Sequence, residues 1–148
     1  MTRGPEAARH RATAEIGTMR GLKRLIDVAL ASVGLVVLAI AVPLVWIGDR
    51  VANRGPLLYR QARVGKGGVP FEILKFRTMR PAPDGTTHNE WTREDDPRIT
   101  PFGHFLRTTH LDELPQVLNI LRGELAMVGP RPEQPAYVEE LTEKLPFY

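Results

Sequence analysis

Two adjacent acids, Asp112 and Glu113, are the side chains whose type and position best suit chemistry. They stand in THLDELPQVLNILRGE, where apolar residues recur at helical spacing from Leu114 and Gly123 provides a helix stop. This pattern predicts both carboxylates at the start of a helix. Acids are favoured there by about 0.3–1 kcal/mol, so a capping role is the alternative to a catalytic one.

Basic residues accompany these acids along the chain. They are Lys75 and Arg77 in an upstream apolar segment, Arg98 and Arg107 before the acids, and Arg131 in the motif GPRP. Arginine binds phosphate oxygens through its planar fork. Mg²⁺ commonly bridges one or two carboxylates to substrate phosphates. The combination predicts a diphosphate-binding site in which Asp112 and Glu113 are the metal ligands and Mg²⁺ the cofactor.

Composition narrows the class of protein. The 148 residues contain no cysteine, which excludes disulfides, thiolate metal sites and a cysteine nucleophile. Residues 1–80 carry 14 basic and 5 acidic side chains, whereas residues 81–148 carry 6 and 12. The basic half also holds a long apolar run. We therefore expect it to meet an anionic membrane surface, with membrane lipids rather than nucleic acid as the partner.

The apolar run extends from Val28 to Gly48 without a charged residue and is long enough to cross a bilayer. Basic residues flank both ends, although positive charge normally marks only the cytoplasmic side. A helix that enters the membrane, breaks at Pro43 and returns to the same face would satisfy both flanks. The alternatives are an ordinary spanning helix with a kink and a cleaved signal peptide.

The remaining elements are shorter. Leu57–Val64 and Val69–Met79 predict a β-hairpin around a glycine-rich turn, residues 80–98 a long surface loop, and Ile99–Arg107 a short helix. Three scattered histidines have no metal-ligand spacing and are expected at the surface: His88, His104 and His110.

Three stretches of this chain resemble the bacterial sugar transferases, the monotopic phosphoglycosyl transferases. They are KRLIDVAL (Lys23–Leu30), GPLLYRQARVGKGGVPFEILKFRTM (Gly55–Met79) and DPRITPFGHFLRTTHLDELPQVLNILRGELAMVGPRPE (Asp96–Glu133). The resemblance implies a re-entrant membrane helix and an Asp-Glu catalytic dyad that falls on Asp112 and Glu113.

By that resemblance Asp112 attacks the β-phosphorus of a nucleoside diphosphate sugar, usually a UDP-sugar, and UMP leaves. Polyprenyl (undecaprenyl) phosphate then accepts the sugar phosphate from the enzyme, which starts an exopolysaccharide or other surface glycan. Glu113 assists the second step or helps to hold Mg²⁺, and the five basic residues bind substrate. The implied location is the bacterial inner (cytoplasmic) membrane, with the catalytic domain facing the cytoplasm.

The resulting fold class is α+β, a mainly helical cytoplasmic domain on an N-terminal re-entrant membrane helix, with a small β-hairpin. We expect a disordered basic tail over residues 1–19, the membrane helix and its flank over 20–54, and the catalytic domain over 55–148, shorter at its C-terminus than family members. The alternatives are a catalytically silent, membrane-associated phosphate- or nucleotide-binding module, and a truncated fragment. The sugar, the pathway and a homo-oligomeric state remain open.

Overall fold

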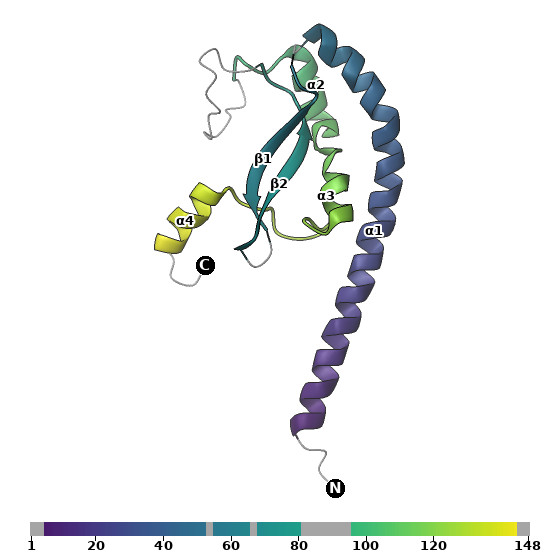
Figure 1. Ribbon diagram of the computed structural model, residues 1–148, viewed down its shortest axis with the longest axis vertical. Helices are drawn as coiled ribbons and strands as arrows, with labels where there is room; N and C mark the ends of the chain where they lie inside the picture. The colour runs from purple at the N-terminus through teal and green to yellow at the C-terminus, as the bar shows by residue number, and fades with distance from the viewer. Residues whose placement is uncertain (1–4, 53–54, 66–67, 81–95, 145–148) are drawn as a thin grey trace.

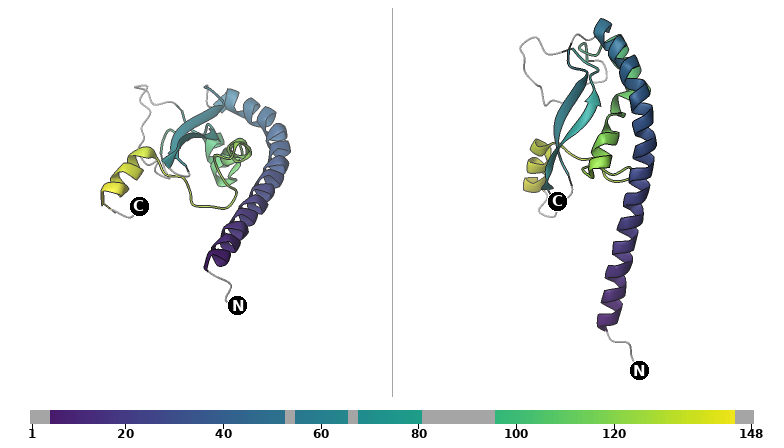
Figure 2. Two further views of the ribbon diagram at one scale, coloured as in Figure 1. Left: turned by 60° about the horizontal axis from the view of Figure 1, so that its bottom comes forward. Right: turned by 45° about the vertical axis from the view of Figure 1, so that its right-hand side comes forward.

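The computed structural model describes residues 5–52, 55–65, 68–80 and 96–144, with side chains from residue 17 onward except at positions 140 and 142. The elements in chain order are α1 (Pro5–Ala52), β1 (Leu58–Val64), β2 (Pro70–Phe76), α2 (Pro101–Thr108), the 3₁₀ turn η2 (Leu111–Glu113), α3 (Gln116–Arg122) and α4 (Pro135–Lys144). They form layers: α1 lies along α2 and α3, which in turn cover the β1–β2 hairpin, and α4 lies at the other side of the hairpin (Figures 1 and 2).

Helix α1 begins at Pro5, so residues 5–19 are helical where a disordered tail was expected. The local sequence explains the difference. PEAARHRATAEIG is rich in alanine, the strongest helix former, and proline is well suited to a first helical turn. Basic composition alone was a poor guide to disorder in this segment, and the helix extends below the rest of the molecule (Figure 1).

One narrow stripe of α1 is buried and the rest of its surface is exposed. The buried residues follow the helical period: Asp27, Ala31, Leu38, Val45 and Asp49. Fourteen large apolar side chains of α1 are exposed, among them Leu25, Val33 and Leu44. Among the described residues this is the one helix, over Gly17–Ala52, that is long and apolar enough to cross a membrane. A core helix of a water-soluble domain would bury such side chains, so this surface suits lipid.

Pro43 lies inside α1 and does not end it. The helix therefore continues through the position where a break was expected, and it curves around the rest of the molecule (Figure 1). A proline removes one backbone hydrogen bond and pushes against the preceding turn, which helices accommodate by bending when packing supports them. Val42 beside it packs against the hydrophobic core.

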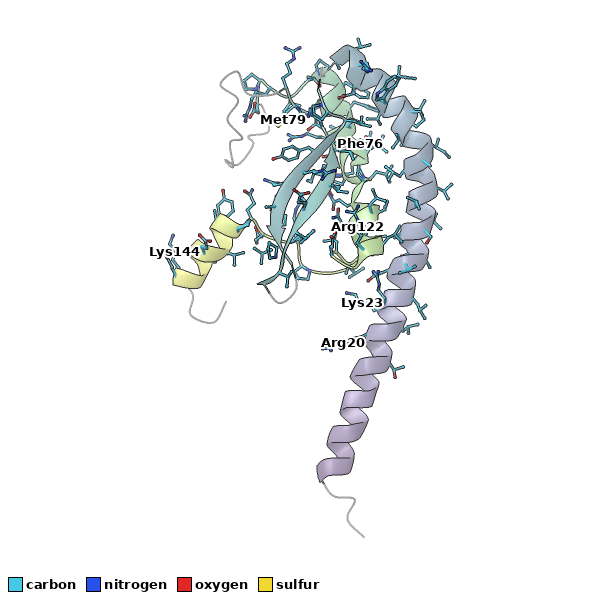
Figure 3. All side chains as sticks on the ribbon, viewed as in Figure 1. Arg20, Lys23, Phe76, Met79, Arg122 and Lys144 are labelled. Atoms are coloured by element: carbon cyan, nitrogen blue, oxygen red, sulfur yellow. The ribbon has the colours of Figure 1, made fainter. Side chains whose placement is uncertain are left out.

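Two glycines let α1 approach the shorter helices closely. A Cβ atom added at Gly34 would lie 2.7 Å from Cγ1 of Val117 on α3. One added at Gly48 would overlap the ring of Phe102 on α2. The core between the layers contains Leu38 and Val45 of α1, and Phe76, Leu106 and Val117 of the other elements. Figure 3 shows Phe76 on the side of the hairpin that faces α1.

The predicted hairpin is confirmed. Strands β1 and β2 are antiparallel, and Tyr59 pairs with Lys75 while Arg63 pairs with Phe71. Each strand begins one residue later than predicted, and β2 also ends three residues earlier, at Phe76. Beyond β2, an isolated bridge joins Met79 to Ile99, so the chain re-enters the fold beside the strand it left.

The short helix predicted over Ile99–Arg107 is also confirmed, as α2, with Thr100 as its N-cap. Gly123 ends α3 in the left-handed conformation, as expected. The position of the acids differs from expectation. Asp112 and Glu113 lie in η2, and Pro115, not an acid, is the N-cap residue of α3. Helix α4 had not been predicted.

Candidate active site

The two acids stand at a sharp reversal of the chain between α2 and α3. His110 immediately before them has φ 56° and ψ 16°, the left-handed conformation that few non-glycine residues adopt. Thr109 and His110 thus end α2 and allow η2 to start in a new direction. Asp112 becomes buried, whereas the Glu113 side chain keeps 35% of its exposure. The reversal therefore points the two neighbouring acids into different environments.

Glu113 is the meeting point of two cations that lie far away in sequence. Its Oε1 accepts hydrogen bonds from Nζ of Lys75 at 2.9 Å and from the guanidinium of Arg131 at 3.0 Å. Burial by itself raises the pKa of Glu113, but the hydrogen bond and charge of Lys75, with the charge of Arg131, leave it below its usual value. Lys75 and Arg131, both predicted as site residues, are thus brought together by the fold.

Strand β1 holds the GPRP segment that carries Arg131. The backbone N–H of Val64 donates to the carbonyl of Glu133 at 2.8 Å, and the Arg63 guanidinium donates to the carbonyl of Pro132 at 3.1 Å. Burial and then the neighbouring charge of Arg131 lower the pKa of Arg63. Arg63 is a member of this cationic cluster that was not predicted, because its approach to Arg131 depends on the tertiary contact between β1 and the GPRP segment.

Asp112 has a different environment from that of its neighbour. Burial raises its pKa, the positive charge of Lys75 opposes this effect, and the negative charge of Glu113 adds to it. Arg107 also lowers the pKa from its position on α2, where its guanidinium donates to Oγ1 of Thr78 and contacts the sulfur of Met79. A partly desolvated carboxylate beside cations is an arrangement suited to nucleophilic attack on a phosphorus atom.

The two other predicted arginines, Arg98 and Arg77, have contacts of their own. Arg98 forms a salt bridge with Asp96 at 2.6 Å, and the same carboxylate accepts the Arg98 backbone N–H. Arg77 lies against Gly55, where the absence of a side chain leaves room for the guanidinium. The ion pair and the backbone bond of Arg98 thus stabilise the turn that begins at Asp96.

The histidine expectation holds where it can be examined. His104 and His110 are exposed, and His88 lies outside the described residues, as does most of the predicted surface loop. Within the described ranges, no group of three or more His, Asp or Glu side chains could hold a metal ion. A divalent ion at this site would therefore draw on the two adjacent carboxylates and on oxygens from a substrate.

The site combines a buried carboxylate, Asp112, with a cation-bound one, Glu113, beside an apolar helix. A comparison with known protein families identifies the class of protein to which this chain belongs. Residues 18–148 match the model of the bacterial sugar transferase family, and the chain belongs to that family.

Individual relatives are named for related activities. A protein of Bacillus subtilis strain 168, 40% identical over 130 residues, is provisionally named an undecaprenyl-phosphate N-acetylgalactosaminyl 1-phosphate transferase. Proteins of Caulobacter vibrioides (41% identical over 126 residues) and Escherichia coli K12 (36% over 132) are named UDP-glucose:undecaprenyl-phosphate glucose-1-phosphate transferases. These matches cover 86%, 85% and 89% of this chain, but 70%, 47% and 28% of the respective relatives.

Proposed function

We propose that this protein transfers a sugar 1-phosphate from a UDP-sugar to undecaprenyl phosphate, and so starts a surface glycan on the cytoplasmic face of the bacterial inner membrane. The observation that carries the proposal is the convergence of Lys75 and Arg131 on Glu113, directly beside the buried Asp112. The names of the relatives support the acceptor lipid and the transferred group. Because those names include both glucose and N-acetylgalactosamine, the sugar itself is left open.

The proposed reaction has two displacements at phosphorus. A carboxylate oxygen of Asp112 attacks the β-phosphorus of the UDP-sugar, the bond from that phosphorus to the bridging oxygen breaks, and UMP leaves. The sugar phosphate is then held on Asp112 as an acyl phosphate. An oxygen of undecaprenyl phosphate attacks the same phosphorus, which releases the Asp112 carboxylate and gives the undecaprenyl diphosphate sugar. Splitting the transfer in this way replaces one difficult step with two easier ones.

The surrounding cations have separate roles in this scheme. Arg131 is largely exposed at the solvent side of Glu113, where its planar guanidinium group can bind phosphate oxygens. Lys75, mostly buried, holds Glu113 in place and lowers the negative potential that incoming phosphates would meet. Arg107 provides positive charge on the Asp112 side. Together they would stabilise charge on the departing UMP.

Mg²⁺ is the cofactor we propose, and the donor set fits it. No side chain among the described residues donates to the Asp112 carboxylate, which hydrogen-bonds its own backbone N–H and can still bind a cation. Glu113 engages Lys75 and Arg131 through Oε1. Mg²⁺ is typically held by one or two carboxylates together with substrate phosphates and water. Asp112 would be the principal ligand and Glu113 the secondary one, and the ion would supply neutralisation of phosphate charge.

The packing of α1 supports a re-entrant rather than a spanning membrane helix. Just before the apolar run of α1, Arg24 donates hydrogen bonds to the carbonyls of Ile120 and Leu121. Toward its C-terminal end, Gly48 lies against the ring of Phe102. One polar domain thus contacts α1 before and at the end of the apolar run. A helix crossing the bilayer would place these two contacts on opposite sides, so we propose that both ends lie on the cytoplasmic face.

The chemistry is tested by exposing the protein to UDP-sugars and Mg²⁺ and measuring UMP release and intact mass. We expect a sugar-phosphate adduct in the wild type and none in Asp112→Asn, which keeps the shape of the side chain but loses the nucleophile. Glu113→Gln should slow turnover and still form the adduct if Glu113 acts in the second step. Full activity of Asp112→Asn would refute the mechanism, and absence of UMP release from the wild type would favour the silent binding module.

The topology is tested separately with His10→Cys and His88→Cys, which introduce single thiols into a chain without cysteine. We expect neither thiol to react with an impermeant reagent in intact cells. Labelling of position 10 alone would contradict the re-entrant arrangement, because it would place the two ends of α1 on opposite faces.

A further inference from the structure

The outer edge of β2 is covered by a side chain instead of a third strand. Asn119 of α3 accepts the backbone N–H of Leu74 through Oδ1 at 3.1 Å and donates from Nδ2 to the carbonyl of Glu72 at 2.7 Å. Its carboxamide thus offers one acceptor and one donor to β2, as a neighbouring peptide group would. The edge is closed at this point by α3 itself.

Asn119 is completely buried, and its amide has a third partner. Nδ2 also donates to Oε2 of Glu124 at 2.7 Å, just beyond the end of α3. Burying a polar amide is costly unless its groups are paired, and here both the oxygen and the nitrogen are. A leucine of similar volume would suit a hydrophobic interior equally well. The asparagine therefore provides directional bonds that apolar packing cannot.

The two elements that Asn119 joins are the ones that carry the charged pair of the site. Lys75 follows Leu74 directly on β2, and Glu113 precedes α3 in η2. The hydrogen bond from Lys75 to Glu113 is a second link between β2 and the segment that contains η2 and α3. Because β2 contributes to the site mainly through Lys75, its register against α3 sets where the ammonium group lies.

We propose that Asn119 is a positioning residue of the active site: its bonds to the edge of β2 fix Lys75 against Glu113. The inference rests on the proposed phosphoglycosyl transfer. In this proposal Asn119 touches neither the substrate nor the acid pair. It acts only through the backbone of residues 72–74. Misplacing a catalytic group by about 1 Å can cost up to about a hundredfold in rate, so the loss of this support should appear in turnover.

The test compares three variants of the full chain in detergent or nanodiscs. Asn119→Leu removes all three hydrogen bonds and keeps the branching and the number of side-chain heavy atoms. Asn119→Asp keeps the acceptor for Leu74, but loses the donor to Glu72 and Glu124 and places a carboxylate oxygen beside both acceptors. Ile120→Ala, the matched control, weakens packing of the adjacent buried residue on α3 and leaves the β2 edge bonds intact. UMP release is measured at varied UDP-sugar and is expressed per folded molecule.

We expect Asn119→Leu to lower kcat at least about tenfold while KM changes far less, because orientation of the acids matters most in the transition state. Asn119→Asp should be intermediate, and Ile120→Ala close to wild type. Amide hydrogen exchange of Leu74 should quicken in Asn119→Leu, which removes the acceptor, and change little in Asn119→Asp and in the control. If Asn119→Leu does not fold, Asn119→Asp carries the comparison.

Two results would overturn the inference: wild-type kcat in the folded Asn119 variants, or an equal loss of kcat in Ile120→Ala. Either is distinguishable from failure of the proposed function, because that failure would appear as absence of UMP release from the wild-type protein.

Discussion

The carboxylate of Asp27 accepts the backbone N–H of Met127 at 3.1 Å, although 100 residues separate them. Asp27 is almost completely buried on the inner face of α1. One helical turn earlier, Arg24 donates hydrogen bonds to the carbonyls of Ile120 and Leu121 in the last turn of α3. The polar residues in KRLIDVAL thus dock the apolar helix onto the domain that carries the acids.

Arg24→Met should destabilise this docking by about 1.5–3 kcal/mol, because it removes two charge-assisted hydrogen bonds while keeping the apolar stem. Thermal unfolding in detergent measures the effect. Lys23→Met is the control, since Lys23 is exposed on the neighbouring position and should change stability by less than about 0.5 kcal/mol. Equal stability of the two variants would contradict the proposed contribution of Arg24.

Gly34→Ala should destabilise the protein by about 1–3 kcal/mol, because the new methyl group would meet Val117 at 2.7 Å and push α1 away from α3. Gly21→Ala makes the same chemical change on the same helix where nothing lies within 4 Å. It should stabilise by about 0.5–1 kcal/mol through helix propensity. Chemical denaturation should therefore shift in opposite directions for the two variants; a shift in the same direction would argue against close α1–α3 packing.

Arg131→Ala should lower kcat/KM by about tenfold to a hundredfold, equivalent to about 1.5–3 kcal/mol, if Arg131 binds phosphate oxygens. Its exposed bond to Glu113 should contribute little to stability, so the unfolding temperature should hardly move. Arg131→Lys should recover only part of the loss, because an ammonium group lacks the fork. Arg122→Ala, at the exposed end of α3, is the control, and unchanged kinetics in Arg131→Ala would remove that residue from the site.

Asp96 should titrate with a pKa of about 2, because its hydrogen bonds with Arg98 favour the charged form over the ordinary value of 3.8. A carboxyl whose pKa is lowered by folding contributes stability above its unfolded pKa. That contribution is lost as the pH falls from about 3.8 through about 2. Carboxyl NMR of the wild type and of Arg98→Gln tests this expectation. The variant should move the Asp96 pKa toward 3.8, and a wild-type value near 3.8 would exclude the ion pair in solution.

The predictable parts of this protein were those encoded by neighbouring residues. Periodicity and glycine positions predicted the hairpin, α2 and the end of α3, because hydrogen bonding and side-chain direction in these elements depend on residues a few positions apart. The membrane helix was predicted for the same reason, because its apolar residues follow one another in the sequence. Where charge was used in place of helix propensity, in residues 5–19, the prediction of disorder failed.

The sequence alone determined that Asp112 and Glu113 are adjacent, and that basic residues accompany them at several distances along the chain. Only the tertiary structure decided that Glu113 receives Lys75, 38 residues away, and Arg131, 18 residues away, while Arg98 turns to Asp96. It also placed Arg63 beside Arg131 and Asn119 on the edge of β2. Such choices depend on how a hairpin, a turn and three helices pack together, which is set by the sum of many weak contacts and by no local pattern of residues.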